Sequence, residues 1–150
     1  MYENVLSGQF YPRNPQKYIG DHTKIFYRSS WEAKCMSYFD REESIIAWAS
    51  EEVVIPYLSP VDGKKHRYFP DFLVKSKTKD GKLATMLIEV KPKKQVEQPK
   101  KKKRVTKQYI SEVSTWGINQ AKWKAAREHC ADRGWQFMIW SEEHLGISTK

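Results

Sequence analysis

The sequence has few cysteines and no long apolar run. Its two cysteines, Cys35 and Cys130, stand alone rather than in CxxC pairs, which argues against a disulfide framework and against a zinc knuckle. No stretch approaches the roughly 20 apolar residues of a membrane helix, and residues 1–20 lack the apolar segment of a signal peptide. We therefore expect a protein that is not exported by a signal peptide, does not enter membranes and works in a reducing compartment.

Positive charge is what the sequence has in excess. It contains 27 Lys and Arg against 18 Asp and Glu, a formal net charge of +9. Such a bias concentrates polyanions near the surface, so nucleic acid is the first partner to expect. A basic surface that only confers solubility is the alternative. With 150 residues, 39% of them hydrophobic, the chain is long enough for one core and one domain.

The first part of the chain differs from the rest. Residues 1–27 combine prolines, glycines, asparagines and aromatics without a helical or strand period, which predicts an extended N-terminal arm before a single domain over residues 28–150. Ser29 or Ser30 can then cap a helix over residues 30–41, whose apolar side chains recur at helical spacing.

Three strands are expected next. A short apolar segment at residues 45–48 leads into a β-branched run at 52–58, and a Pro- and Asp-Gly-containing turn joins it to a second strand at 66–74. Another turn at 79–82 precedes a third strand at 83–91, which ends in a continuous apolar run. The pattern predicts a hairpin extended into a three-stranded meander.

The last third of the chain predicts a loop, a helix and a strand. Residues 92–107 are rich in lysine and form an expected mobile basic loop. Helical spacing resumes by Tyr109, pauses near Gly117 and stops at Gly134, before a strand at 135–140. The order α-β-β-β-α-β favours an α/β fold with a central mixed sheet flanked by helices. An α+β domain with only antiparallel strands is the alternative.

Charged residues close the most apolar strand of the sequence. Glu89 and Lys91 are two positions apart and so face the same side, and a hairpin can bring Asp71 beside them. Carboxylates of this kind hold a divalent cation for phosphodiester hydrolysis, while a lysine can orient or help deprotonate the attacking water. The ordinary alternative is an acid near a turn and a surface ion pair.

Two further groups complete the expected site. The backbone carbonyl of Val90 can add a metal ligand, and Glu32 can bind the metal directly or through water if its helix packs beside the hairpin. The predicted catalytic residues are Glu32, Asp71, Glu89 and Lys91, and the predicted metal ligands are Asp71, Glu89, Val90 and Glu32. The expected cofactor is Mg²⁺, with Mn²⁺ as a substitute.

The basic residues after this strand are candidates for contacts with DNA phosphates, which would make binding depend on salt but hardly on sequence. Lys122, expected near the start of the later helix, can meet a phosphate there. A solvated, disordered loop is the alternative. The predicted DNA-binding residues are Lys93, Lys94, Lys100, Lys101, Lys102, Lys103, Arg104, Lys107 and Lys122.

Four segments carry a family resemblance. Residues 28–32, 68–72, 88–92 and 119–123 resemble, in order and spacing, the restriction-endonuclease-like transposase subunits of the PD-(D/E)xK class. Nearly the whole chain also resembles the head completion nucleases of T-even-type tailed bacteriophages. The resemblance implies an Mg²⁺-dependent DNA endonuclease with Glu32, Asp71, Glu89 and Lys91 in the catalytic positions. The transposase relatives can carry Gln where Glu89 stands here, and Glu is the stronger metal ligand.

The phage resemblance implies a setting as well. It points to the host cell cytoplasm during assembly, with action on the filled head after DNA packaging and before tail attachment. Double-stranded DNA and head, portal or neck proteins are the expected partners, while the oligomeric state and a lasting place in the virion stay open. Two alternatives remain, a non-catalytic DNA-binding protein and a structural protein that docks on the head through the aromatic arm from Tyr2 to Tyr18.

Overall fold

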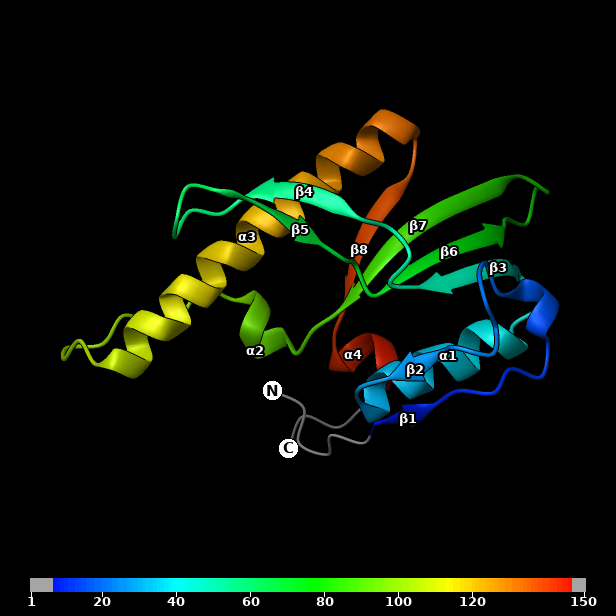
Figure 1. Cartoon of the computed structure of the whole chain (residues 1–150), viewed down its shortest axis with the longest axis horizontal. Coiled ribbons are helices and arrows are strands. Elements are labelled where there is room, and N and C mark those ends of the chain that lie inside the picture. Colours follow the sequence, from blue (N-terminus) through cyan, green and yellow to red (C-terminus); the bar gives the residue numbers. More distant parts are fainter. Residues whose placement is uncertain (1–6, 147–150) are drawn as a thin grey trace.

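The centre of the fold is a four-stranded sheet in the order β3-β6-β7-β8 (Figure 1). The structure is a computed structural model, and it describes residues 7–146. The strands are β3 (Ile45–Ser50), β6 (Phe72–Lys77), β7 (Leu83–Val90) and β8 (Gln136–Trp140). β3, β6 and β7 pair antiparallel, whereas β8 runs parallel to β7. The predicted mixed sheet is confirmed, and the purely antiparallel alternative is wrong.

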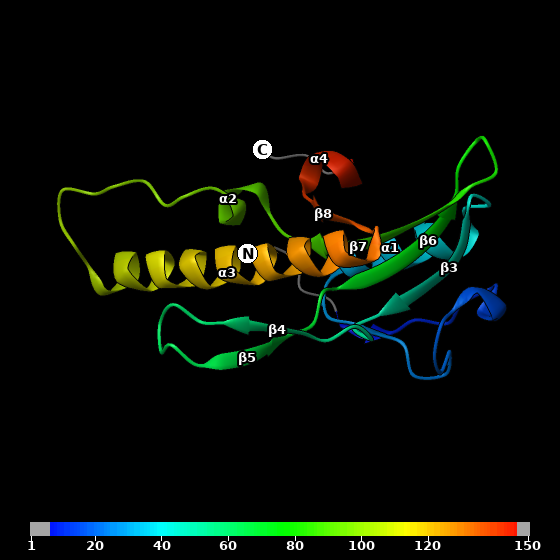
Figure 2. The same ribbon diagram turned by 90° about the horizontal axis from the view of Figure 1, so that it is seen from above.

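Helices cover both faces of this sheet (Figures 1 and 2). The helices are α1 (Ser30–Arg41), α2 (Lys93–Val96), α3 (Lys107–Arg133) and α4 (Glu142–Leu145). Alternate side chains of β7 point to opposite faces of the sheet. Ile88 and Val90 pack in the cluster with α1, whereas Leu87 packs in the cluster with α3. Glu89 therefore belongs to the side of α3. Among residues 7–146, none of the helices combines the length and apolar composition needed to cross a membrane.

The helix ends follow from local chemistry. The Ser29 hydroxyl accepts a hydrogen bond from the Glu32 N–H at 3.2 Å, which fixes the start of α1 as predicted. α3 ends at Gly134, whose φ of 71° suits glycine, and this predicted end is confirmed too. The predicted pause at Gly117 is wrong, because α3 runs through it. A Cβ at Gly117 would lie 3.8 Å from the Pro60 ring, an ordinary van der Waals contact, so the position has room for a small side chain.

The predicted strand 66–74 is wrong as a single strand, because it breaks at residues 69–71. Pro70 has no N–H for a ladder, so β5 (Lys65–Tyr68) ends before it and β6 begins after it. The chain that pairs with this segment breaks at the matching position, between the end of β3 and the start of β4 (Ile55–Leu58). β4 and β5 pair only with each other, as a separate two-stranded ribbon lying on α3 (Figure 2).

The N-terminal segment packs against the domain. Residues 7–27 contain β1 (Gly8–Gln9), the short 3₁₀ helix η1 (Pro15–Lys17) and β2 (Phe26–Tyr27). The Tyr18 ring is buried against Trp48, with the centroids 4.8 Å apart, and the Asp40 carboxylate accepts the backbone N–H groups of Arg13 and Asn14. Tyr18 is therefore not available for docking on a partner. Residues 1–6 of the predicted arm lie outside the described residues.

Candidate active site

The fold brings Asp71 and Glu89 together at one end of the sheet. Phe72 pairs with Ile88 in the β6–β7 register, so the residue before Phe72 lies beside the residue after Ile88. The Asp71 Oδ2 atom accepts the Val90 N–H at 2.7 Å, which fixes this carboxylate against β7. Glu89 is only 7% exposed. Buried Glu89 and half-buried Asp71 therefore lie side by side, where the sequence predicted them.

Both oxygens of the Glu89 carboxylate have partners. The Tyr68 hydroxyl, which is buried, donates to Oε1 at 2.6 Å. The Lys91 Nζ atom lies 3.7 Å from Oε2, as expected for residues two apart on one strand. Sequence reasoning missed Tyr68, because a continuous strand 66–74 would have turned it away from Asp71.

Burial makes this acid pair electrostatically costly. Desolvation, followed by the Glu89 charge, raises the pKa of Asp71 well above its usual value. Burial also raises the pKa of Glu89, although the Tyr68 hydroxyl and the Lys91 ammonium oppose the shift. Each carboxylate thus opposes ionisation of the other, and a bound cation would relieve the repulsion.

Glu32 approaches the pair from α1 without joining it. Its Oε1 atom accepts the Arg28 N–H at 3.3 Å, and the Ser29 hydroxyl lies 3.4 Å from Oε2. Burial, and then the charge of Glu51, raise the pKa of Glu32, and its own charge contributes to the raised pKa of Asp71. Yet no three acidic, histidine or cysteine side chains within residues 7–146 are placed to hold one metal ion together. The structure therefore assembles two of the three predicted carboxylates.

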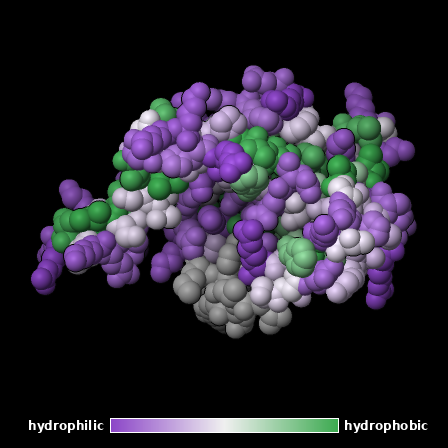
Figure 3. Space-filling model, in the orientation of Figure 1, coloured by the Kyte–Doolittle hydropathy of each residue, from purple (hydrophilic) through white to green (hydrophobic). Residues whose placement is uncertain are grey.

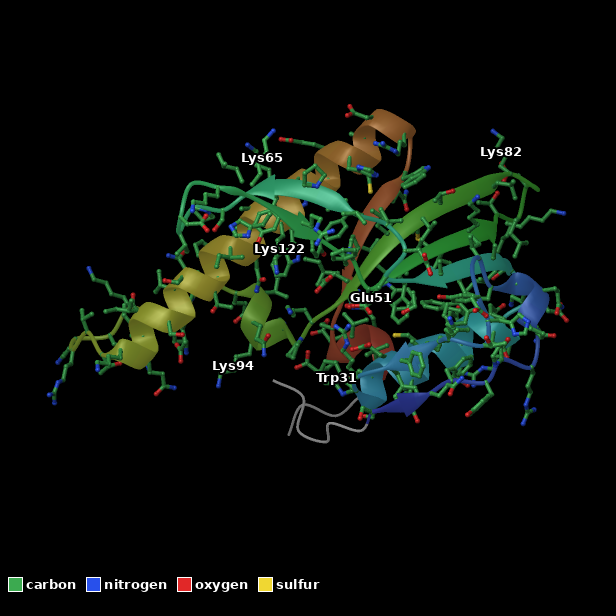
Figure 4. The ribbon with its side chains drawn as sticks, in the orientation of Figure 1. Trp31, Glu51, Lys65, Lys82, Lys94 and Lys122 are labelled. Carbon is green, nitrogen blue, oxygen red and sulfur yellow. The ribbon has the colours of Figure 1, made fainter. Side chains whose placement is uncertain are left out.

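A fourth acid, Glu51, lies at the break between β3 and β4 and was missed by the sequence reasoning. Its φ of 53° is in the left-handed region, which is unusual for a residue with a side chain. The Glu51 N–H donates to the Asp71 carbonyl at 3.0 Å, and its carboxylate pairs with Arg28 at 3.1 Å. Figure 4 places Glu51 near the junction of β5 and β6. Glu51 thus ties the backbone of Asp71 to the segment before α1.

Lys122 lies in the middle of α3, so its predicted place near a helix start is wrong. Its Nζ atom is 5.8 Å from the centroid of the Tyr57 ring and 5.7 Å from that of Tyr68. Burial and then the Lys91 charge lower the pKa of Lys122, while Glu89 and Asp71 oppose this shift. Lys122 therefore adds a second cation beside the acid pair, after Lys91.

The other predicted DNA-binding residues lie on α2, on the loop 97–106 and at the start of α3, along the side of α3 away from the β4–β5 ribbon (Figure 2). All of their side chains are exposed. Lys93 differs from the rest, because its Nζ atom pairs with Glu143 at 3.3 Å and its N–H donates to Glu142 at 2.8 Å. Lys93 thus anchors α2 to α4, whereas Lys94 points away from the domain in Figure 4.

The donor set suits a hard divalent cation. Mg²⁺ keeps several waters and is commonly bound by one or two carboxylates together with phosphate oxygens. Two carboxylates at a strand end, with pKa values raised by burial and, for Asp71, also by the Glu89 charge, fit that requirement. Cysteine chemistry does not, because burial and the nearby charges of Asp71 and Glu32 raise the pKa of Cys35 to about 12.

The raised pKa values predict how stability depends on pH without metal. Just above the usual carboxyl pKa of about 4, folded Glu89 keeps a proton that the unfolded chain has released, because its folded pKa is raised. The free energy of unfolding therefore decreases as the pH rises from the unfolded pKa through the raised folded pKa of Glu89, because the stabilising contribution of the bound proton is lost. Urea unfolding from pH 4 upward should show native protein losing stability relative to Glu89→Gln. A pH-independent difference would contradict the shift.

Comparison with known proteins identifies the family of the chain. Residues 42–142 match the family model described as TnsA-like endonuclease N terminal. Over 145 residues, 94% of this chain and 94% of the relative, the sequence is 42% identical to the head completion nuclease of Enterobacteria phage T4. The resemblance inferred from the four segments is confirmed. Asp71, Glu89, Lys91 and Lys122 lie inside the family match, while Glu32 precedes it.

Proposed function

Because the chain belongs to the TnsA-like endonuclease family, we propose that it is a metal-dependent endonuclease that hydrolyses phosphodiester bonds of double-stranded DNA. The observation that carries the proposal is the acid pair at a strand end, in which half-buried Asp71 lies beside buried Glu89, with Lys91 3.7 Å from Glu89. A structural ion pair has no need of a second acid withdrawn from solvent. A site for a divalent cation does, because its charge offsets both carboxylates.

In this proposal Mg²⁺ is held by Asp71, Glu89 and the Val90 carbonyl, and Mn²⁺ can substitute for it. Glu32, at the edge of the site, binds the metal through a water molecule. The cation, when bound, lowers the pKa of water and polarises the phosphate. Tyr68 fixes the orientation of Glu89 through the 2.6 Å hydrogen bond. The Lys91 ammonium orients the attacking water and offsets negative charge that grows on the phosphorus oxygens as water attacks.

The proposed setting rests on the similarity to a head completion nuclease. Since a head completion nuclease is 42% identical to this chain, we infer that the chain also acts in completing a phage head, after DNA packaging and before tail attachment, in the host cell. Head, portal or neck proteins are then its protein partners. The exposed lysines of loop 97–106 and Lys107 contact DNA phosphates in this proposal.

Cleavage of supercoiled plasmid at low salt tests the proposed function. The protein is incubated with Mg²⁺, with Mn²⁺ and with EDTA, and nicked and linear products are followed over time. We expect cutting with either metal and none with EDTA. Binding of DNA without cutting under every metal condition would overturn the nuclease and favour a non-catalytic DNA-binding or head-stabilising protein.

Lys122 should contribute to the cleavage step rather than to DNA affinity. Lys122→Met keeps an apolar stem against Tyr57 and Tyr68 but removes the charge beside the acid pair. We expect single-turnover cleavage to slow about a hundredfold, the usual effect of removing one group that stabilises transition-state charge. The control is Lys124→Met, since Lys124 is 79% exposed on the same helix and pairs with Glu128. Equal rates in the two variants would exclude this role.

A further inference from the structure

The β4–β5 ribbon has one buried face. In its register Ile55 pairs with Tyr68 and Tyr57 with His66. Alternation puts these four on the side of α3, where Ile55, Tyr57 and Tyr68 pack in one cluster with Trp123. The ribbon is therefore fixed on the helix rather than hanging from the domain.

The opposite face of the ribbon is uncovered. It carries Pro56 and Leu58 from β4 and Lys65 and Arg67 from β5, paired Pro56 with Arg67 and Leu58 with Lys65. All four are exposed, Leu58 by 61%. Figure 3 shows apolar and hydrophilic side chains next to each other over this part of the molecule. On this face the cations Lys65 and Arg67 therefore lie next to the apolar side chains of Leu58 and Pro56.

Positive charge on the ribbon is not neutralised by neighbours. Within residues 7–146, Lys64, Lys65 and Arg67 take part in no ion pair. The acid of the ribbon, Asp62, is engaged by His66, with Nε2 and Oδ2 2.7 Å apart. The ribbon thus presents three cations to an incoming anion.

The tip of the ribbon is ordered by its own hydrogen bonds. The Ser59 carbonyl accepts the Gly63 N–H at 2.9 Å, and the Ser59 N–H donates to the Lys64 carbonyl at 2.9 Å. Asp62 Oδ1 accepts the Lys64 N–H at 2.9 Å. A tip held in this way loses little conformational freedom when it binds.

The ribbon leads directly into the acid pair. Tyr68 ends β5 and donates to Glu89, and Asp71 follows only three positions later. Figure 4 shows Lys65 on the ribbon, with Lys122 on the helix beneath it. A duplex held by the ribbon is therefore held in a fixed relation to the two carboxylates.

We propose that the β4–β5 ribbon lies along a groove of duplex DNA, with Lys64, Lys65 and Arg67 contacting phosphates and Leu58 facing the groove. This inference rests on the proposed function and names the element that selects double-stranded substrate. A two-stranded ribbon fits the major groove, which is about 12 Å wide. Single strands lack this groove and gain only the charge contacts.

The test compares Lys65→Ala/Arg67→Ala with a matched control, Lys79→Ala/Lys82→Ala, on the exposed β6–β7 turn far from the ribbon in Figure 4. Affinity for a duplex and for a single strand of equal length is measured by fluorescence anisotropy in EDTA at several salt concentrations. Cleavage with Mg²⁺ is measured separately at saturating DNA.

For the ribbon variant we expect a shallower slope of log duplex affinity against log salt concentration. The slope should decrease in magnitude by about two, one for each lost phosphate contact. Native protein then loses about tenfold more affinity than the variant between 50 and 200 mM salt. Single-strand affinity should change less. If duplex affinity is unchanged while native protein cuts, the ribbon is not the DNA-binding element. An equal loss for single strands would also overturn groove binding. If native protein neither cuts nor binds DNA, the proposed function itself is wrong, and the ribbon inference falls with it.

Discussion

Asp71→Asn should slow cleavage about a thousandfold while leaving the metal-free protein at least as stable as the native one. Asparagine can still accept the Val90 N–H, but it removes one of two carboxylates whose charges repel each other. The loss of rate should be about a thousandfold, because a bound metal stabilises transition-state charge by several kcal/mol and about 1.4 kcal/mol corresponds to tenfold. Single-turnover cleavage and urea unfolding in EDTA measure the two effects.

The response to metal distinguishes this site from a structural acid pair. At Mg²⁺ tenfold above its dissociation constant, native protein should gain about 1.4 kcal/mol in free energy of unfolding. Asp71→Asn should gain none. Asp132→Asn, an exposed acid of α3, is the control and should respond like the native protein. If Asp71→Asn still cuts DNA or still gains stability from Mg²⁺, Asp71 is not a metal ligand.

Trp48→Ala should cost about 3–5 kcal/mol of stability, as for other large aromatic side chains removed from a core. Trp48 is fully buried in β3, and its ring lies within 6.3 Å, centroid to centroid, of the rings of Phe10, Tyr18, Phe39 and Phe72. It therefore joins the N-terminal segment, α1 and the sheet. Urea unfolding of the variant in EDTA measures the loss.

Two substitutions control for this result. Ile46→Ala changes a neighbour on the same strand that is 41% exposed, and should cost less than about 1 kcal/mol. Trp48→Phe should cost less than Trp48→Ala, because it keeps most of the contact area and removes an indole N–H that is buried without a hydrogen-bond partner in the described structure. Equal losses for Trp48→Ala and Ile46→Ala would contradict the central place of Trp48.

The acid pair was predictable from the sequence for a local reason. Glu89 and Lys91 are on one strand, so their shared face depends only on the period of two. A turn at residues 79–82 then brings the preceding strand alongside, and this placed Asp71 next to Glu89. Both inferences use neighbours along the chain or across one hairpin. They do not depend on how the helices pack.

The break at residues 69–71 could not be predicted in this way. Pro70 was visible, but the matching break at Glu51 has a left-handed φ that no residue pattern announces. Because both sides of the hairpin break together, β4 and β5 leave the sheet and Tyr68 turns to Glu89. When side-chain alternation is applied as if strand 66–74 were continuous, it places Tyr68 on the wrong face.

Packing between distant segments accounts for the other differences. Residues 7–27 lack a period of their own, yet Tyr18 and Ile25 are buried because the surface of β3 and α1 receives them. Lys122 reaches the acid pair because the middle of α3 lies against the ribbon. This placement depends on how many residues of α3 precede Lys122. Such contacts join residues far apart in sequence, where local patterns carry no information.

The parallel strand β8 has a consequence for biosynthesis. All four predicted catalytic residues have been translated by Lys91, but Glu89 pairs with Ile139, and the Lys91 N–H donates to the Trp140 carbonyl at 2.9 Å. A nascent chain therefore has the carboxylates long before it has the strand that holds them in register. We therefore expect the proposed site to be complete only after residues 136–140 have been synthesised and have paired with β7.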